Sequence, residues 1–167
     1  MVNLLLPLTM RHFRLVVTAL LGMDACYRIV RNHDFIQHGS TSLYNHCRNV
    51  ALMSLKIARS FKIKVDEDSL VRGALLHDYY LYDWHDKLAR PHLHGFFHPG
   101  IALKNALEEF DLNSTEKDII KHHMFPLTLV PPSTKEGWIV SVADKLCSLY
   151  ETFRRNEVHL RKRNVLV

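Results

Sequence analysis

The stretch LLHDYYLYDWHDK, residues 75–87, places a histidine and an aspartate directly after two leucines of helical character. Upstream, the acidic segment VDEDS (65–69) suits a helix N-terminus, so a helix is expected from there to His77-Asp78. A buried carboxylate is costly unless a positive charge compensates it. The spacing of the lysines and arginines does not require any of them to lie beside Asp78. A divalent metal ion would supply the positive charge instead.

The remaining segments also have a helical pattern. Residues 44–61, YNHCRNVALMSLKIARSF, carry apolar side chains at a period of about 3.6, which predicts a helix that opens at Ser42 with Thr41 or Ser40 as its cap. The segment NSTEKD (113–118) predicts another helix start, with Glu116 closing a capping box. Further helices are expected over 8–31, 98–110, 115–123 and 135–155, with an irregular stretch over 84–97. No alternating strand pattern is present, so the predicted class is all-α.

Composition indicates one globular domain over 1–167, because 167 residues that are 47% hydrophobic can bury a sizeable core. The net charge of +5 is concentrated in a basic tail, 154–167, and the remainder holds 17 basic and 16 acidic residues. We therefore expect neither a nucleic acid polymer as a partner nor, since charges interrupt the apolar N-terminal run, a membrane. Three cysteines without a CxxC pair are typical of a reducing, cytoplasmic setting. No pattern in the sequence sets an oligomeric state.

Histidine is the unusual component, because seven of the 12 histidines lie between residues 77 and 123. Any one histidine on an apolar face is most often an ordinary core residue, but here several interrupt apolar faces on separate predicted helices. The candidate metal ligands are His46, His77, Asp78, His98, His122, His123 and Asp144. Their nitrogen and oxygen donors suffice for two ions with positions open to water and substrate. His94 competes with His98 as the ligand of its segment.

His46, the pair His77-Asp78, and Asp144 within VADKL resemble the defining quartet of the HD-domain superfamily of metal-dependent phosphohydrolases. The resemblance covers about residues 40–150. His98, followed by PGIALKNA, and the pair His122-His123 resemble the extra histidines of the branch that holds two metal ions.

The resemblance implies a compact all-α HD-domain bundle with two divalent metal ions. It implies that Asp78 bridges both ions, that His46, His77 and Asp144 complete one, and that His98, His122 and His123 complete the other. Imidazole and carboxylate ligands admit iron, manganese, cobalt, nickel or zinc, and the resemblance favours iron or manganese. The loop MFPLTLVPP (124–132) lacks the Gly-Tyr-Pro pattern of the cyclic-di-GMP phosphodiesterase branch, which disfavours that activity.

The expected function is hydrolysis of a phosphomonoester or phosphodiester by a metal-bound hydroxide, on a small and nucleotide-like substrate. Asp78, His77 and Lys145 are the predicted catalytic residues, and Lys145, Arg90 and His94 are the predicted substrate contacts. The aromatic residues Tyr79, Tyr80, Tyr82 and Trp84 either stack against a nucleobase or pack around the metals.

Two alternatives remain open at this point. One is a di-iron oxygenase, since a few relatives with this ligand arrangement activate oxygen. The other is a metal-dependent binding or sensing module without turnover.

Overall fold

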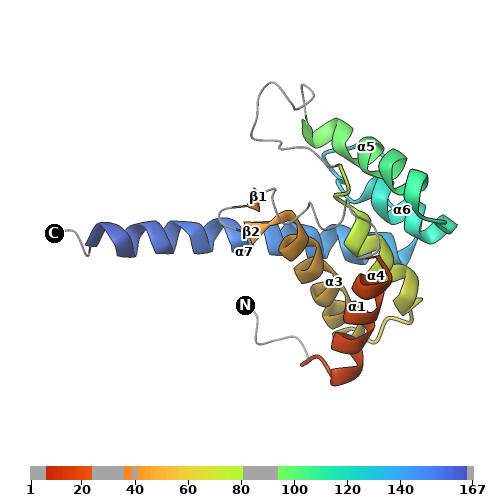
Figure 1. The fold of residues 1–167 in the computed structure, drawn as a ribbon, viewed down its shortest axis with the longest axis horizontal. Coiled ribbons are helices and arrows are strands. Elements are labelled where there is room, and N and C mark those ends of the chain that lie inside the picture. The colour runs from red at the N-terminus through yellow and green to blue at the C-terminus, as the bar shows by residue number, and fades with distance from the viewer. Residues whose placement is uncertain (1–6, 24–35, 39–40, 81–93, 165–167) are drawn as a thin grey trace.

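The computed structural model describes residues 7–23, 36–38, 41–80 and 94–164, and over these ranges the chain is a bundle of helices (Figure 1). The helices are α1 (Met10–Met23), α3 (Leu43–Ser60), α4 (Glu67–Leu76), α5 (His94–Glu109), α6 (Ser114–His122) and α7 (Lys135–Asn164). The expected all-α class is confirmed. A short antiparallel ribbon of β1 (Ile36–His38) and β2 (Thr41–Ser42), which the sequence pattern did not predict, precedes α3.

Helix α3 is the central element, since it packs against α4, α7 and α1. Ser42 is its N-cap and accepts the N–H of Asn45 at 3.4 Å, so the helix begins one residue later than expected. Its buried face includes Leu43, Val50 and Leu55. On the same face lies His46, which puts a polar side chain inside the core.

Helix α4 begins at the acidic segment and ends where the histidine–aspartate pair starts. The carboxylate of Asp66 caps it by accepting the N–H groups of Asp68 at 3.2 Å and of Ser69 at 3.4 Å. Leu76 is its last residue and His77 its C-cap. His77 and Asp78 therefore lie at the C-terminal end of a buried helix.

Helices α5 and α6 follow the expected order, with one difference at the start of α5. The prediction took Gly95 as a breaker before a helix at 98, but the helix begins at His94. A Cβ at residue 95 would lie 2.8 Å from Cδ2 of Leu127, so this glycine serves close packing within the helix. At α6 the predicted capping box is confirmed: Asn113 accepts the N–H of Glu116 at 2.9 Å, and Glu116 accepts that of Asn113 at 3.0 Å.

Helix α7 runs nine residues further than the expected 135–155, and its C-terminal half projects beyond the bundle (Figure 1). Its start is tied to α6, because Asp118 accepts the N–H groups of Ser133 at 3.0 Å and of Thr134 at 2.9 Å. These hydrogen bonds hold α6 and α7 together beside the core.

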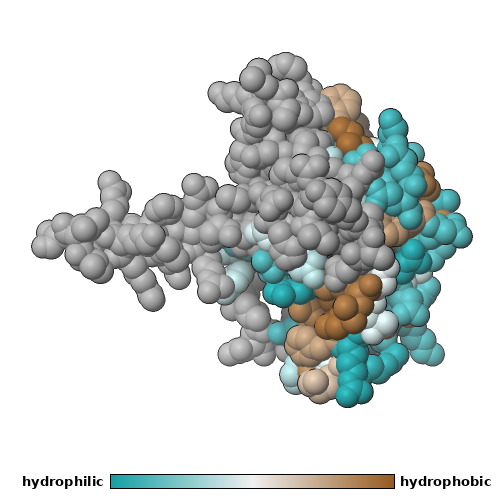
Figure 2. All heavy atoms as spheres, in the orientation of Figure 1, coloured by the Kyte–Doolittle hydropathy of each residue, from teal (hydrophilic) through white to brown (hydrophobic). Residues whose placement is uncertain are grey.

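The surface is mixed in character. Hydrophobic surface lies over the region of α1 in the view of Figure 2, where Met10, Phe13, Val17 and Leu21 are exposed. Among the described residues, no helix combines the length and the hydropathy needed to cross a membrane.

Gly73→Ala is expected to lower the free energy of unfolding by about 1–3 kcal/mol, the usual cost of overpacking a core. The new Cβ would lie 2.5 Å from Cδ1 of Ile119, where α4 meets α6. Gly100→Ala on α5 is the matched control, because a Cβ there meets nothing within 4 Å. Urea denaturation followed by circular dichroism compares the two, and equal stabilities would contradict the expected close packing at Gly73.

Candidate metal centre

Six of the seven predicted ligands converge between the helices. His46 lies in the first turn of α3, His77 and Asp78 directly follow α4, and His98 lies on α5. His123 is the C-cap of α6, and Asp144 lies on α7. All six side chains are buried. Residues from five segments therefore share one polar interior.

The first group of ligand atoms comes from His46, His77 and Asp144, which lie within 4.8 Å of one another. The Oδ1 atom of Asp144 is 3.1 Å from Nε2 of His46 and 3.8 Å from Nε2 of His77. Two ligands that each lie about 2.1 Å from one ion are about 3–3.5 Å apart at ordinary coordination angles. The spacing in this group thus fits a shared ion.

The second group surrounds Oδ1 of Asp78. That oxygen is 3.1 Å from Nε2 of His98 and 3.4 Å from Nε2 of His123, and the two nitrogens are 2.9 Å apart. His77, Asp78 and His123 also form a group within 4.8 Å. These spacings again fit ligands of one ion.

Asp78 joins the two groups through its two oxygens. While Oδ1 contacts His98 and His123, Oδ2 lies 3.5 Å from Nε2 of His77 and 4.0 Å from Nε2 of His46. A carboxylate with one oxygen toward each set of imidazoles has the arrangement of a ligand that bridges two ions. The donor set and the spacing fit the divalent metal ions that the sequence predicts.

Helix ends orient two of the imidazoles. The Nδ1 atom of His77 donates to the carbonyl of Ala74 at 2.7 Å, and that of His123 donates to the carbonyl of Ile120 at 2.9 Å. These carbonyls are free because the last turn of a helix leaves its C=O groups without helical partners. Both rings therefore turn Nε2 toward the centre. Among the described residues, the buried Nε2 of His77 has no hydrogen-bond partner, which is the state expected of an atom that ligates a metal.

Glu151 is a further member of the centre that sequence reasoning missed. Its Oε2 accepts a hydrogen bond from Nδ1 of His46 at 2.9 Å, while Nδ2 of Asn49 donates to its Oε1 at 3.1 Å. A carboxylate on the far nitrogen of a metal-binding histidine fixes the ring and raises its basicity. Its spacing of seven residues from Asp144 puts both on the same face of α7, and this was the available signal.

The electrostatics of the centre favour imidazolium–carboxylate pairs. Burial lowers the pKa of His46, but hydrogen bonds to Asp144 and Glu151 outweigh it and raise the pKa to about 10. Burial also lowers the pKa of His77, but the charge of Asp78 outweighs it and raises this pKa well above its usual value. For His123, burial lowers the pKa to about 4 and the hydrogen bond to Asp78 opposes this. Protons on His46 and His77 therefore take the place that cations can occupy.

The two aspartates respond in the opposite sense. Burial raises the pKa of Asp78, yet the charge of His77 and the hydrogen bonds from His123 and His98 bring it well below its usual value. Asp144 behaves in the same way, since burial is outweighed by the hydrogen bond from His46 and by the nearby imidazole of His77. Both carboxylates are thus held ionised inside the core, ready to ligate a cation.

The structure does not bring His122 to this centre. Its Nδ1 lies 2.8 Å from Oδ1 of Asp118, the residue that ties α6 to α7. Neighbouring residues on a helix point about 100° apart, so His123 and His122 face different directions. Only His123 reaches the metal ligands.

The other predicted site residues have different placements. The ammonium group of Lys145 donates to the carbonyls of His123 at 2.9 Å and Ser141 at 3.1 Å, so it contacts the backbone beside the centre. Arg90 lies outside the described residues, as do Tyr82 and Trp84. His94 begins α5, but its side chain is not described.

Tyr80 packs against the centre, and Tyr79 packs against Phe110 in the hydrophobic core. Both are buried, and the hydroxyl of Tyr79 donates to Oε2 of Glu109 at 2.9 Å. The ring of Tyr80 meets that of His98 edge-on, with centroids 5.7 Å apart. For Tyr80 the packing alternative holds, and neither residue stacks on a nucleobase, because a buried ring offers no face for one.

Glu151→Gln is expected to weaken metal binding by about 10–100-fold, the usual effect of losing a charged partner of a ligating histidine. Competition against a chromophoric chelator measures the affinity. Glu108→Gln, which removes a carboxylate from an exposed position on α5, is the matched control. An unchanged affinity in Glu151→Gln would show that Glu151 does not act on the metal site.

Metal uptake at pH 7 is expected to release protons and to tighten as the pH rises toward 10. His46, with a pKa of about 10, and His77 are protonated in the metal-free protein at neutral pH, and both must lose a proton to ligate. Titration calorimetry in buffers with different ionisation enthalpies counts the protons released. Uptake without proton release would contradict a ligand role for these two rings.

Comparison with known proteins supports this reading of the site. The family model for the HD domain matches residues 43–149, a range that contains all six converging ligands. Searches of curated proteins and of solved structures find no significant match. The model covers more than half of the chain, and its members are generally metal-dependent hydrolases. The chain therefore belongs to the HD-domain family.

Proposed function

We propose that this protein is a metal-dependent phosphohydrolase with a dinuclear centre. The observation that carries the proposal is the position of Asp78, whose two oxygens contact separate pairs of imidazoles. Two divalent ions about 3.5–4 Å apart suit phosphate-ester hydrolysis, since they clamp the attacking and leaving oxygens. The proposed substrate is a small phosphomonoester or phosphodiester, of nucleotide type.

Each described side chain has a defined task in this proposal. His46, His77 and Asp144 would hold one ion, His98 and His123 the other, and Asp78 would bridge them. When bound, the ions supply a Lewis acid for the phosphoryl oxygens and lower the pKa of a water molecule. Iron or manganese is the proposed metal.

The surrounding residues position this machinery. Glu151 holds the His46 ring through its Nδ1 atom, at 2.9 Å. Lys145 donates to the carbonyl of His123 at 2.9 Å, so we assign it a positioning role toward that ligand. Arg90 and His94 remain the proposed contacts to the substrate phosphate.

A panel of phosphomonoesters and phosphodiesters, assayed with added manganese, tests the proposal. We expect hydrolysis of at least one ester, with loss of the activity to background in Asp78→Asn and His77→Ala, because each change removes a ligand. Lys104→Gln, an exposed change on α5, is the control and should retain full activity.

Metal analysis of the same variants separates the possible outcomes. Two ions per chain in the native protein and one in His98→Ala would agree with the proposal. A native protein that holds two ions, turns over no ester and consumes oxygen would indicate the di-iron oxygenase instead. Bound metal with neither activity would indicate a binding or sensing module.

A further inference from the structure

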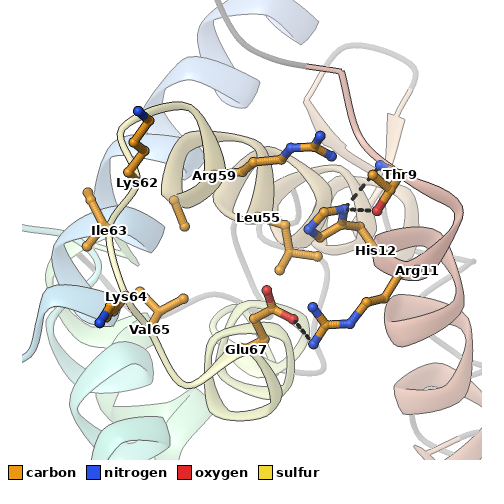
Figure 3. A pocket seen from close by; sticks show the side chains of 11 residues that line it. Thr9, Arg11, His12, Leu55, Arg59, Lys62, Ile63, Lys64, Val65 and Glu67 are labelled. Atoms are coloured by element: carbon orange, nitrogen blue, oxygen red, sulfur yellow. Dashed lines mark hydrogen bonds and ion pairs between the residues drawn. The ribbon is translucent and has the colours of Figure 1, made fainter.

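A cavity lies at the opposite end of α3 from the metal centre. It has a volume of about 760 Å³ and lies between the start of α1, the last turns of α3 and the start of α4 (Figure 3). None of its lining residues belongs to the metal centre. Arg59 is 13 residues beyond His46 on α3, which at 1.5 Å per residue places them about 20 Å apart along the helix.

The cavity combines positive charge with an apolar floor. Its lining includes four cationic side chains, those of Arg11, Arg59, Lys62 and Lys64, against one carboxylate, that of Glu67. The Oε2 atom of Glu67 forms an ion pair with Nη2 of Arg11 at 2.8 Å. Leu55, Ala58, Ile63 and Val65 supply the apolar part. Among the described residues, the lining charges without an ion pair are therefore all positive.

Arg59 lines the cavity and has no counter-charge among the described residues. Its side chain is half-buried, and its enclosed Nη1 atom has no hydrogen-bond partner among the described residues. A guanidinium group in this state is costly, because buried charges are normally paired. Figure 3 shows Arg59 next to His12, whereas the guanidinium of Arg11 points toward Glu67.

His12 adds a neutral donor beside Arg59. Its ring is buried, and its Nδ1 accepts the N–H of Thr9 at 3.1 Å at the start of α1. A neutral imidazole that accepts at Nδ1 carries its proton on Nε2. That N–H is then available to an acceptor in the cavity.

Lys62 stands on the rim in an unusual backbone conformation. Its φ is 53°, in the left-handed region that favours glycine. The turn is a Schellman motif, with Ile63 N–H donating to Ala58 C=O at 2.8 Å and Lys62 N–H to Arg59 C=O at 3.2 Å. A lysine at this position carries a backbone cost that glycine would avoid. It does, however, place another positive charge at the mouth.

We propose that this cavity binds a small organic phosphate, with the phosphate group at Arg59 and His12 and the organic part on the apolar floor. Guanidinium and N–H donors are the groups that recognise phosphate oxygens. The two rim lysines, Lys62 and Lys64, attract the anion through their charge. The site is separate from the metal centre, so it holds a ligand that is not undergoing hydrolysis there.

Adenosine 5′-monophosphate, inorganic phosphate and adenosine are the probes, added to the full-length protein and followed by two-dimensional NMR. The nucleotide should shift the resonances of residues 9–12 and 55–67, with weaker effects from phosphate or adenosine alone. Its affinity should fall as salt is raised, since exposed charges are screened. The same measurement on Asp78→Asn distinguishes the two sites, because shifts at the cavity should persist there. Shifts confined to the metal centre would overturn the proposal.

Two variants separate ligand binding from a structural role. Arg59→Gln should weaken nucleotide binding by at least about tenfold through loss of a charged hydrogen bond, while the melting temperature stays equal or rises. Lys62→Gly should also weaken binding while raising the melting temperature, because glycine suits the left-handed turn. Lys104→Gln, with the same loss of charge on α5, should bind normally. Native affinity in both cavity variants, or a lower melting temperature with unchanged binding, would refute the site.

Discussion

The burial of Asp78 is the constraint on which the rest of the structure depends. An ionised carboxylate inside a core is tolerated only where cations or hydrogen-bond donors surround it. Here the imidazoles of His98, His123 and His77 lie 3.1, 3.4 and 3.5 Å from its oxygens. These partners come from α5, from the end of α6 and from the residue next to Asp78 itself. The bundle must therefore bring its helices to one point, and the same arrangement that satisfies Asp78 forms a ligand set for cations.

Helix termini also fix the orientation of two buried imidazoles. His77 and His123 both follow the last turn of a helix, where a carbonyl three residues earlier accepts the Nδ1 hydrogen. Each ring is then fixed with Nε2 toward the centre. His46 lies in the first turn of its helix, where no such carbonyl is free. A carboxylate from α7, that of Glu151, takes this place. Central helix α3 links the centre to the basic cavity, with polar side chains at both ends of an apolar middle.

Local physical chemistry explains what could be predicted. The capping box of Asn113 and Glu116 and the acidic start of α4 involve residues a few positions apart, so the pattern alone locates these helix ends. Six of the seven predicted ligands lie together in the structure, and they could be selected beforehand because polar residues that interrupt apolar faces stand out in a sequence. The start of α5 could not be predicted, because glycine usually weakens an isolated helix. In the structure, Gly95 lies where a Cβ would be 2.8 Å from Cδ2 of Leu127, and the sequence alone does not reveal this close packing.

By itself, the sequence determined the all-α class, the starts of α4 and α6 and the identity of the residues that interrupt the core, because each depends on spacing along the chain. Only the tertiary structure decided which of two adjacent histidines turns inward, that Asp78 presents one oxygen to each set of imidazoles, and that Glu151 reaches His46 across 105 positions. It also decided that Arg59 lines a cavity and has no counter-charge in the part of the chain that the structure describes. The physical reason is that side-chain direction and long-range pairing follow from how helices pack against one another, which no local pattern encodes.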